Sequence, residues 1–357
     1  MLDQKEMIAK VDQKNMFKLI ADFSTQLKHA EEIGKSSVID PNYAKGVTKI
    51  VFSGLGGSAI GADFVRSYLT YDLSVPIFVN RHYQLPKFVD DKTLLIVSSY
   101  SGETEETLSA FQQGLRSGAK IMAITSGGQL SRQARAHSFP MITIPGGMSP
   151  RAALGYSVLP LLVALSKLGY QEAYRSQEFK EAQELIQKLS DSDYGINIPF
   201  EKNKAKQLAA SCFNRYPIIY SGPDYLDIVA LRWRGQIEEN AKALASHHVF
   251  PEMNHNELVG WKNPKDFLKQ VVVFILRDSE DHKRVQVRMD LTHKIMSQYA
   301  HSVTDLFSQG KSLLARMFSQ VHLGDWVSVY LAVLYQEDPT PVEAIQYLKS
   351  ELSKEPM

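Results

Sequence analysis

Short apolar runs alternate with helix-like stretches through the first half of the chain. Five runs rich in Val, Ile and Leu, each closed by a small or polar residue, lie at 48–54, 75–80, 93–99, 119–125 and 140–145. Continuous apolar runs of this length are typical of parallel strands that are buried on both faces. The stretches between them suit helices, so the pattern predicts an open α/β sheet of about five strands flanked by helices.

The rest of the chain continues in the same style. Apolar residues recur at helical spacing over 5–33, which predicts one N-terminal helix. Residues 151–213 are mostly helical and charged. A second α/β set follows, with strands expected at 217–222, 247–251, 270–278 and 301–309 and a last helix from Pro341 to about Leu352.

The two halves resemble each other weakly. Residues 49–66 and 217–234 each show an apolar strand, a Ser-Gly pair, a loop and a helix. Two copies of one α/β unit explain this economically. We therefore expect an N-terminal helix over 1–33, a first domain over 34–170 and a second domain over 200–357.

Composition narrows the class of protein. The chain has 357 residues, 44% of them hydrophobic, and 40 basic side chains against 39 acidic ones. This balance suits a folded protein of about two domains and argues against nucleic acid as a partner. The single cysteine, Cys212, excludes an intrachain disulfide and a cysteine-ligated metal cluster. With no bilayer-spanning apolar run and a polar N-terminus, we expect a cytoplasmic protein that does not interact with membranes.

A glycine-rich loop follows the first strand. Gly54, Gly56, Gly57 and Ser58 open the next predicted helix, where free backbone N–H groups suit an anion. The same loop matches a dinucleotide fingerprint only in part, because the next strand ends in Asn80 and lacks the acidic residue that binds ribose. A glycine turn needed only for tight packing is the third interpretation.

A hydroxyl-rich loop follows the third strand. Ser99, Ser101 and Thr104 stand directly before a predicted helix, so three hydroxyls and the first helix amides are available to one phosphate. Simple helix capping needs only one such hydroxyl. The cluster therefore favours a phosphate site over a cap.

The two loops together resemble those of the sugar isomerase (SIS) domain family. The second half narrows the resemblance to the bifunctional phosphoglucose/phosphomannose isomerases, through segments 232–242 and 251–257, and through Asp338-Pro339 leading to Leu348-Lys349. The resemblance extends from about residue 45 to the end of the chain. It implies two SIS-type α/β sandwich domains, each with a mostly parallel sheet. It also implies a cofactor-free and metal-free enzyme that interconverts glucose 6-phosphate, mannose 6-phosphate and fructose 6-phosphate through a cis-enediolate.

The resemblance also implies roles for individual residues. Glu239 matches the family's base and Arg151 its enediolate-stabilising arginine. His255 matches the histidine that opens the sugar ring, which in the family comes from the neighbouring subunit of a homodimer. Lys349 matches a lysine near the ring oxygen, and Thr340 is the nearest candidate for a small threonine that lets the intermediate rotate. The remaining positions, which bind the substrate, are Gly56, Gly57, Ser58, Ser99, Ser101 and Thr104.

Without the resemblance these residues have ordinary interpretations. Glu239 lies in a predicted helix whose residues Ile237, Ala241 and Leu244 are expected to face the core, and a helical carboxylate is usually solvated. Adjacent Glu238 is a competing candidate for the base. A carboxylate base at neutral pH works best with a raised pKa, which partial burial against the sugar would supply.

Alternatives from other classes remain, and one of them, an NAD(P) oxidoreductase, is disfavoured by Asn80-Arg81 at the end of the second strand. The same fold serves phosphosugar-binding sensor modules, which usually carry an additional DNA-binding domain that this chain lacks. Alternatively, the cluster His247, His248, Glu252, His255 and Glu257 suggests zinc by its residue types. Neighbouring histidines on a strand point to opposite faces, however, which disfavours a shared metal ion.

Overall fold

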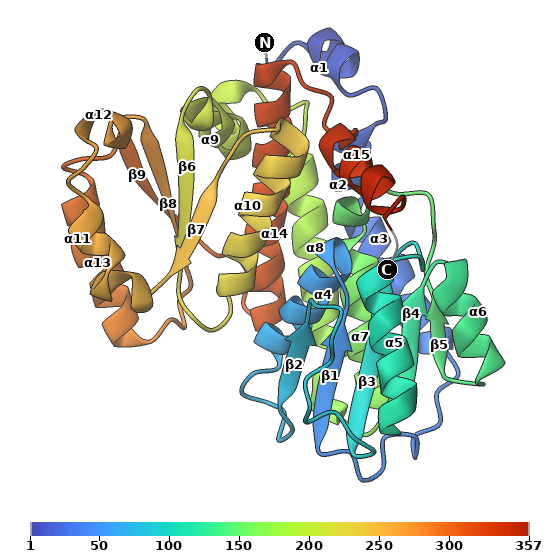
Figure 1. Cartoon of the computed structure of the whole chain (residues 1–357). Coiled ribbons are helices and arrows are strands. Elements are labelled where there is room, and N and C mark those ends of the chain that lie inside the picture. The colour runs from blue at the N-terminus through green and yellow to red at the C-terminus, as the bar shows by residue number, and fades with distance from the viewer. Residues whose placement is uncertain (1, 356–357) are drawn as a thin grey trace.

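The chain folds into two α/β domains, each built on a parallel sheet. The computed structural model describes residues 2–355. Figure 1 shows the two sheets side by side, with a long helix, α14 (Leu313–Tyr335), running between them. The first sheet has the strand order β2-β1-β3-β4-β5 and the second β7-β6-β8-β9, and every neighbouring pair is parallel. None of the described helices is long and apolar enough to cross a membrane.

The strands agree with the apolar runs of the sequence, so the expected α/β fold is confirmed. Their bounds are β1 Lys49–Ser53, β2 Ile77–Asn80, β3 Thr93–Ser99, β4 Lys120–Thr125, β5 Met141–Thr143, β6 Tyr216–Ser221, β7 Ser246–Val249, β8 Val271–Arg277 and β9 Ser302–Phe307. The helices of the first half are α1 Lys5–Val11, α2 Met16–Ala21, α3 Phe23–Ser36, α4 Gly56–Tyr68, α5 Glu105–Ser117, α6 Gly128–Ala136, α7 Leu154–Lys167 and α8 Ser176–Leu189. Those of the second half, besides α14, are α9 Lys204–Cys212, α10 Asp227–Ala241, α11 Glu257–Gly260, α12 Lys265–Leu268, α13 Lys283–Met296 and α15 Glu343–Leu352.

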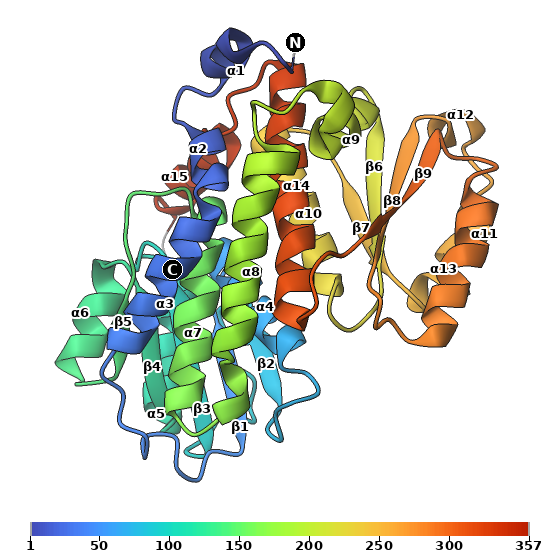
Figure 2. The ribbon, with the colours of Figure 1, turned by 180° about the vertical axis from the view of Figure 1, so that it is seen from behind.

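Both faces of each sheet are covered. In the first domain α5 and α6 pack on one face, while α3, α4 and α7 pack on the other, as a comparison of Figures 1 and 2 shows. In the second domain α13 covers one face, and α10 and α14 cover the other. The faces covered by α7 and by α14 belong to one continuous apolar core, so the two domains share their largest hydrophobic cluster.

The internal repeat is present in the topology. The four strands β2-β1-β3-β4 have the same order and direction as β7-β6-β8-β9. The helices α4 and α10 follow the matching strands β1 and β6. The two copies therefore place their first βα loops in equivalent positions.

The prediction of one helix over 5–33 was wrong. The segment forms α1, α2 and α3, because Asp12 ends the first helix and its carboxylate accepts the backbone N–H groups of Met16 and Phe17 at 2.7 and 2.9 Å. Asn15, with φ at 59°, takes a left-handed conformation directly before α2, which interrupts the helix. The apolar periodicity persists across the breaks because all three helices bury one side against the same core.

The close packing of α10 against α14 predicts a penalty for enlarging Gly324. A Cβ atom there would lie 2.3 Å from Nε1 of the buried Trp233, which already donates to the carbonyl of Gln320 at 2.7 Å. We expect Gly324→Ala to lower the free energy of unfolding by about 1–2 kcal/mol despite its better helix propensity. Chemical denaturation measures the change. Gly235→Ala is the matched control, because a Cβ there meets open space and should leave stability unchanged or slightly higher; equal effects of the two changes would contradict this packing.

A buried histidine predicts acid sensitivity. His322 is fully buried on α14, and its Nε2 lies 3.0 Å from Nε1 of Trp326 and 2.8 Å from Oγ of Ser190. Burial lowers its pKa from 6.5 to about 3, so between these values the unfolded chain binds a proton that the folded chain does not. The free energy of unfolding should therefore fall as the pH drops below 6.5, by up to about 1.4 kcal/mol per pH unit from this group.

Denaturation curves between pH 4 and 7 measure this slope. In His322→Gln the amide oxygen can still accept from Trp326, and the difference in stability from the wild type should shrink toward low pH. A difference that does not change with pH would contradict the assignment.

Candidate active site

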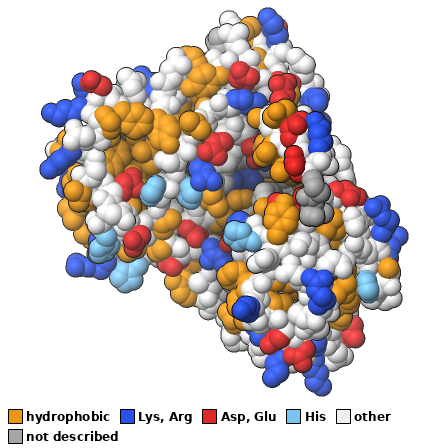
Figure 3. All heavy atoms as spheres, in the orientation of Figure 1, with side chains coloured by type: hydrophobic (Ala, Val, Ile, Leu, Met, Phe, Trp, Pro, Cys, Tyr) orange, Lys and Arg blue, Asp and Glu red, His pale blue; other side chains and the backbone are white. Residues whose placement is uncertain are grey.

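A cavity of about 800 Å³ opens between the two domains. Gly56 and Gly57 line it from the first domain, α10 from the second, and residues 337–338 and 341–345 from the C-terminal segment. Figure 3 shows acidic and basic side chains gathered around the hollow between the two halves of the molecule. The cavity therefore brings together parts of the chain that are far apart in the sequence.

Arg151 is a buried charge at this cavity. Its side chain is only 5% exposed, and Nε donates to Oδ1 of Asn240 at 2.6 Å. Nη1 donates to Oε2 of Glu239 at 3.2 Å, and Nη2 donates to the carbonyls of Pro339 and Thr340. Burial lowers the pKa of Arg151, and Glu239 opposes that shift. The guanidinium thus ties a turn of the first domain to α10 and to the C-terminal segment.

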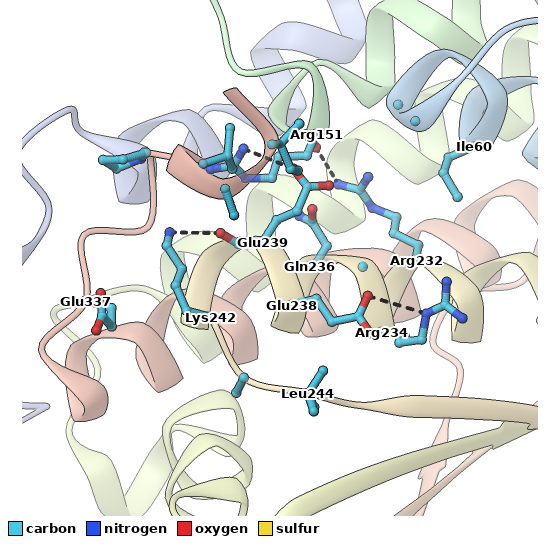
Figure 4. A pocket seen from close by; sticks show the side chains of 18 of the residues that line it. Ile60, Arg151, Arg232, Arg234, Gln236, Glu238, Glu239, Lys242, Leu244 and Glu337 are labelled. Carbon is cyan, nitrogen blue, oxygen red and sulfur yellow. Dashed lines mark hydrogen bonds and ion pairs between the residues drawn. The ribbon is translucent and has the colours of Figure 1, made fainter. Parts of the chain in front are cut away.

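Both candidate bases lie on α10 at the cavity. Glu239 forms the ion pair with Arg151 and is 37% exposed, so it is oriented by a fixed cation (Figure 4). Glu238 lies 3.6 Å from Nε of Arg234, and burial raises its pKa, with Arg234 opposing that shift. The expectation for the helix is correct for Ile237 and Ala241, which are buried.

The expectation that Leu244 faces the core was wrong. It is 76% exposed and lines the cavity. The reason is that α10 ends at Ala241, and Lys242 takes a left-handed conformation with φ at 54°. Leu244 therefore lies beyond the helix, where its periodicity no longer applies.

A stripe of buried polar residues on α10 connects the helix that carries Glu239 to α14. Arg232, Gln236 and Asn240 recur every four residues and are all at most 5% exposed. Asp325 of α14 accepts from Arg232 at 2.8 Å and from Gln236 at 2.8 Å. Ser328 accepts from Asn240 at 2.9 Å. The stripe is thus a buried hydrogen-bond network that joins α10 to α14.

The glycine loop lies where the sequence indicates. Gly56 has φ at 51°, a conformation that favours glycine. A Cβ on Gly57 would lie 2.8 Å from the carbonyl of Pro150, so only glycine lets the start of α4 approach the turn that carries Arg151. Ser58 is buried in the first turn of α4 and is not among the cavity-lining residues.

The hydroxyl loop borders the glycine loop but does not line the cavity. Ser99 and Thr104 are hydrogen-bonded to each other at 2.9 Å, and Ser101 accepts from the backbone of Glu103 at 3.2 Å. Thr104 is the N-cap of α5 and makes no side-chain cap bond, so its hydroxyl is not used for simple capping. The hydroxyl of Tyr100 accepts the backbone N–H of Met148 at 3.0 Å, which joins this loop to the segment before Arg151.

Three further predicted site residues, Thr340, Lys349 and His255, do not line the cavity. Thr340 adjoins the cavity: its carbonyl accepts from Arg151, and its hydroxyl is buried without a partner among the described residues. Lys349 is exposed on α15, one turn beyond the cavity-lining Ile345 on the same helix face. His255 is exposed on a 3₁₀ turn, Glu252–His255, and is absent from the cavity lining of its own chain.

The histidine cluster of the second domain does not converge. His248 Nδ1 lies 2.9 Å from Oε2 of Glu257, whereas His247 Nδ1 lies 3.5 Å from Nη1 of Arg234. Burial, with Arg234 as the next cause, lowers the pKa of His247 to about 4. Within residues 2–355 no group of three or more His, Cys, Asp and Glu side chains is arranged to hold a metal ion.

Three residues at or behind the cavity wall, Arg232, Lys242 and Asp325, have no role predicted from the sequence. Arg232 and Lys242 line the cavity, and Asp325 holds Arg232 from α14. Burial, and secondly Arg151, lowers the pKa of Lys242. The available signal was an aspartate within a largely apolar helical run, together with the four-residue spacing of polar residues on α10.

Comparison with known proteins places these features in a family. The SIS domain model matches residues 45–165, and the model of the bacterial phospho-glucose isomerase C-terminal SIS domain matches residues 201–352. A crystal structure of a hypothetical protein from Thermus thermophilus has the same fold, with a TM-score of 0.72 at 15% identity over 99% of this chain and 93% of that one. The fold and the two matched regions define a two-domain protein of the SIS class.

Sequence relatives identify the family within that class. The bifunctional phosphoglucose/phosphomannose isomerase of Caldicellulosiruptor bescii is 47% identical over 95% of this chain and 99% of its own length. The enzyme of the same name from Aquifex aeolicus is 38% identical over 96% of this chain and 99% of its own length. The chain belongs to the family of bifunctional phosphoglucose/phosphomannose isomerases, as its sequence motifs indicate.

Proposed function

We propose that this protein is a phosphohexose isomerase that interconverts glucose 6-phosphate and mannose 6-phosphate with fructose 6-phosphate. The observation that carries the proposal is the Arg151–Glu239 ion pair, which faces a cavity between the glycine loop of one domain and α10 of the other. Isomerisation needs a base between carbons 1 and 2 and a cation near the oxygens that become negative. We assign the base to Glu239 and a positive charge at the same wall of the cavity to Arg151.

The proposed reaction begins with the phosphate. The hydroxyls of Ser99, Ser101 and Thr104 and the first amides of α5 hold the dianion, and the sugar extends past Gly56 and Gly57 into the cavity. Glu239 takes the proton from carbon 2 of the open-chain aldose, which leaves an enediolate. Returning that proton to carbon 1, while the hydroxyl proton on the carbon 2 oxygen moves to the carbon 1 oxygen, gives the ketose. Arg151, Ser58 and the neighbouring loops orient the intermediate.

Glucose and mannose phosphates differ only at carbon 2 and give the same enediolate. One base serves both if the intermediate can rotate. Thr340 is small and lies beside Arg151, with a buried hydroxyl that has no partner among the described side chains and backbone. We propose that the small side chain of Thr340 leaves the space in which the intermediate rotates. Lys349, on the cavity-lining face of α15, is assigned to the ring oxygen.

Ring opening requires a proton relay, which we assign to the partner subunit's His255 in a homodimer. His255 is exposed and absent from the cavity of its own chain, so a second copy is the natural source of this imidazole. No cofactor or metal ion enters the proposed steps, and we place the enzyme in the cytoplasm.

The sensor alternative predicts binding without turnover. Purified, chelator-treated protein should form glucose 6-phosphate and mannose 6-phosphate from fructose 6-phosphate in assays coupled to each product. Stabilisation by the sugar phosphate without any product would favour the sensor and overturn the proposal.

Replacing the base should separate binding from chemistry. Glu239→Gln keeps the size of the side chain but cannot accept the proton, so we expect turnover to fall at least about a thousandfold while fructose 6-phosphate still binds. Isothermal titration and the coupled assay measure the two effects. Glu238→Gln is the matched control and should retain activity; a dead Glu238→Gln beside an active Glu239→Gln would move the base by one residue.

The shared site predicts complementation between inactive variants. Glu239→Gln and His255→Ala should each be inactive as homodimers. Co-expressed, half of the dimers are mixed, and each mixed dimer has one site with both groups intact, so about a quarter of the sites should be active. In mixed dimers purified through two different tags about half of the sites should be active, and their turnover measures this. An inactive mixed dimer would contradict the assignment of His255 across the interface.

A further inference from the structure

The guanidinium of Arg151 is almost fully engaged with the protein. Its Nε is bound by Asn240, its Nη1 by Glu239, and its Nη2 by two carbonyls of the C-terminal segment. A guanidinium has five N–H donors, so little of this one is left for a ligand. The cavity needs another donor if negative charge is to be stabilised directly.

Arg232 is the second guanidinium at this wall. It lines the cavity from α10 and is 5% exposed. Figure 4 shows its side chain running from α10 toward Arg151, where Nη2 donates to the Arg151 carbonyl at 2.9 Å. The same Nη2 donates to Oδ2 of Asp325 at 2.8 Å. Only one of its three nitrogens is therefore committed to the protein.

The remaining donors of Arg232 have no protein acceptor. Nε is buried and makes no hydrogen bond with any described residue, and Nη1 makes none within residues 2–355. A buried donor without an acceptor is costly, and native proteins rarely keep one without a function. Nε has no accessible surface, whereas Nη1 is not fully buried, so Nη1 is the unused donor that a ligand in the cavity can reach.

Arg232 is also held in place before any ligand arrives. Asp325 is 5% exposed, and Gln236 donates to its second oxygen at 2.8 Å, which fixes the carboxylate that fixes Arg232. Donors that need no rearrangement stabilise developing charge most effectively, and burial strengthens them. Arg232 satisfies both conditions.

We propose that Arg232 is a further substrate-binding residue, which donates through the two N–H groups of Nη1 to the oxygens on carbons 1 and 2 as they become negative. This inference rests on the proposed isomerase function. Arg151 then anchors Glu239 and the C-terminal segment, while Arg232 provides the free donors. The proposal gives the two arginines different tasks that can be measured separately.

Two ligands distinguish charge recognition from simple fit. D-arabinonate 5-phosphate carries a carboxylate where the enediolate oxygens form, and D-arabinitol 5-phosphate has the same phosphate and hydroxyls without that charge. Arg232→Lys keeps a cation for Asp325 but removes the extra donors. We expect it to weaken binding of the arabinonate about tenfold or more and binding of the arabinitol less than about threefold. The kcat for fructose 6-phosphate should fall by at least about tenfold, with a smaller change in KM.

Arg316→Lys is the matched control. Arg316 is also buried and paired with a buried aspartate, Asp278, at 2.9 Å, but it does not line the cavity. It should reproduce any loss of stability without changing the ratio of the two ligand affinities. If Arg232→Lys folds poorly, Arg232→Met combined with Asp325→Leu replaces the buried pair by apolar side chains and is tested in the same way.

The possible outcomes separate this inference from the proposed function. Unchanged arabinonate affinity in an Arg232 variant, or equal weakening of both ligands, overturns the role of Arg232 even if the wild type is a good isomerase. A wild type that binds both ligands but turns over no hexose phosphate overturns the proposed function. Selective loss of the arabinonate in the variant of an active enzyme supports the proposal.

Discussion

The buried charge of Arg151 is the interaction on which the site depends. A guanidinium removed from water is stable only if its donors are satisfied, and Arg151 meets this condition with acceptors from α10 and from residues 339–340. These acceptors and Arg151 itself belong to three distant parts of the chain. The contacts of Arg151 that join the two domains are therefore also the contacts that orient Glu239.

The support for this charge continues inward to α14. Asn240 accepts from Arg151 and donates to Ser328, while Arg232 binds both the Arg151 main chain and Asp325. The long helix of the shared core thus carries polar groups that hold α10 in place. Because every link is buried, small displacements of α14 would be transmitted to the cavity.

The two copies of the α/β unit differ in their chemistry. In the first copy the loop after β3 presents hydroxyls at the start of a helix, which suits an anion. In the equivalent loop of the second copy, after β8, Asp278 is buried and paired with Arg316 at 2.9 Å, so the position is acidic and already neutralised. The second copy instead contributes α10, with Glu239 and Arg232 at the cavity.

The sequence by itself determined the α/β class, the strands, the hydroxyl and glycine loops, and the helix that carries Glu239. These features depend on local patterns: apolar runs suit buried parallel strands, and clustered small residues suit tight turns. The single-helix prediction for 5–33 and the core position of Leu244 failed because helix ends at Asp12 and Lys242 interrupt a periodicity that continues in the sequence. Only the tertiary structure decided that Arg151 pairs with Glu239, that Arg232 keeps free donors, and that His255 lies away from the cavity of its own chain. Such pairings join residues that are distant in sequence, and their energies arise from burial, which no local pattern contains.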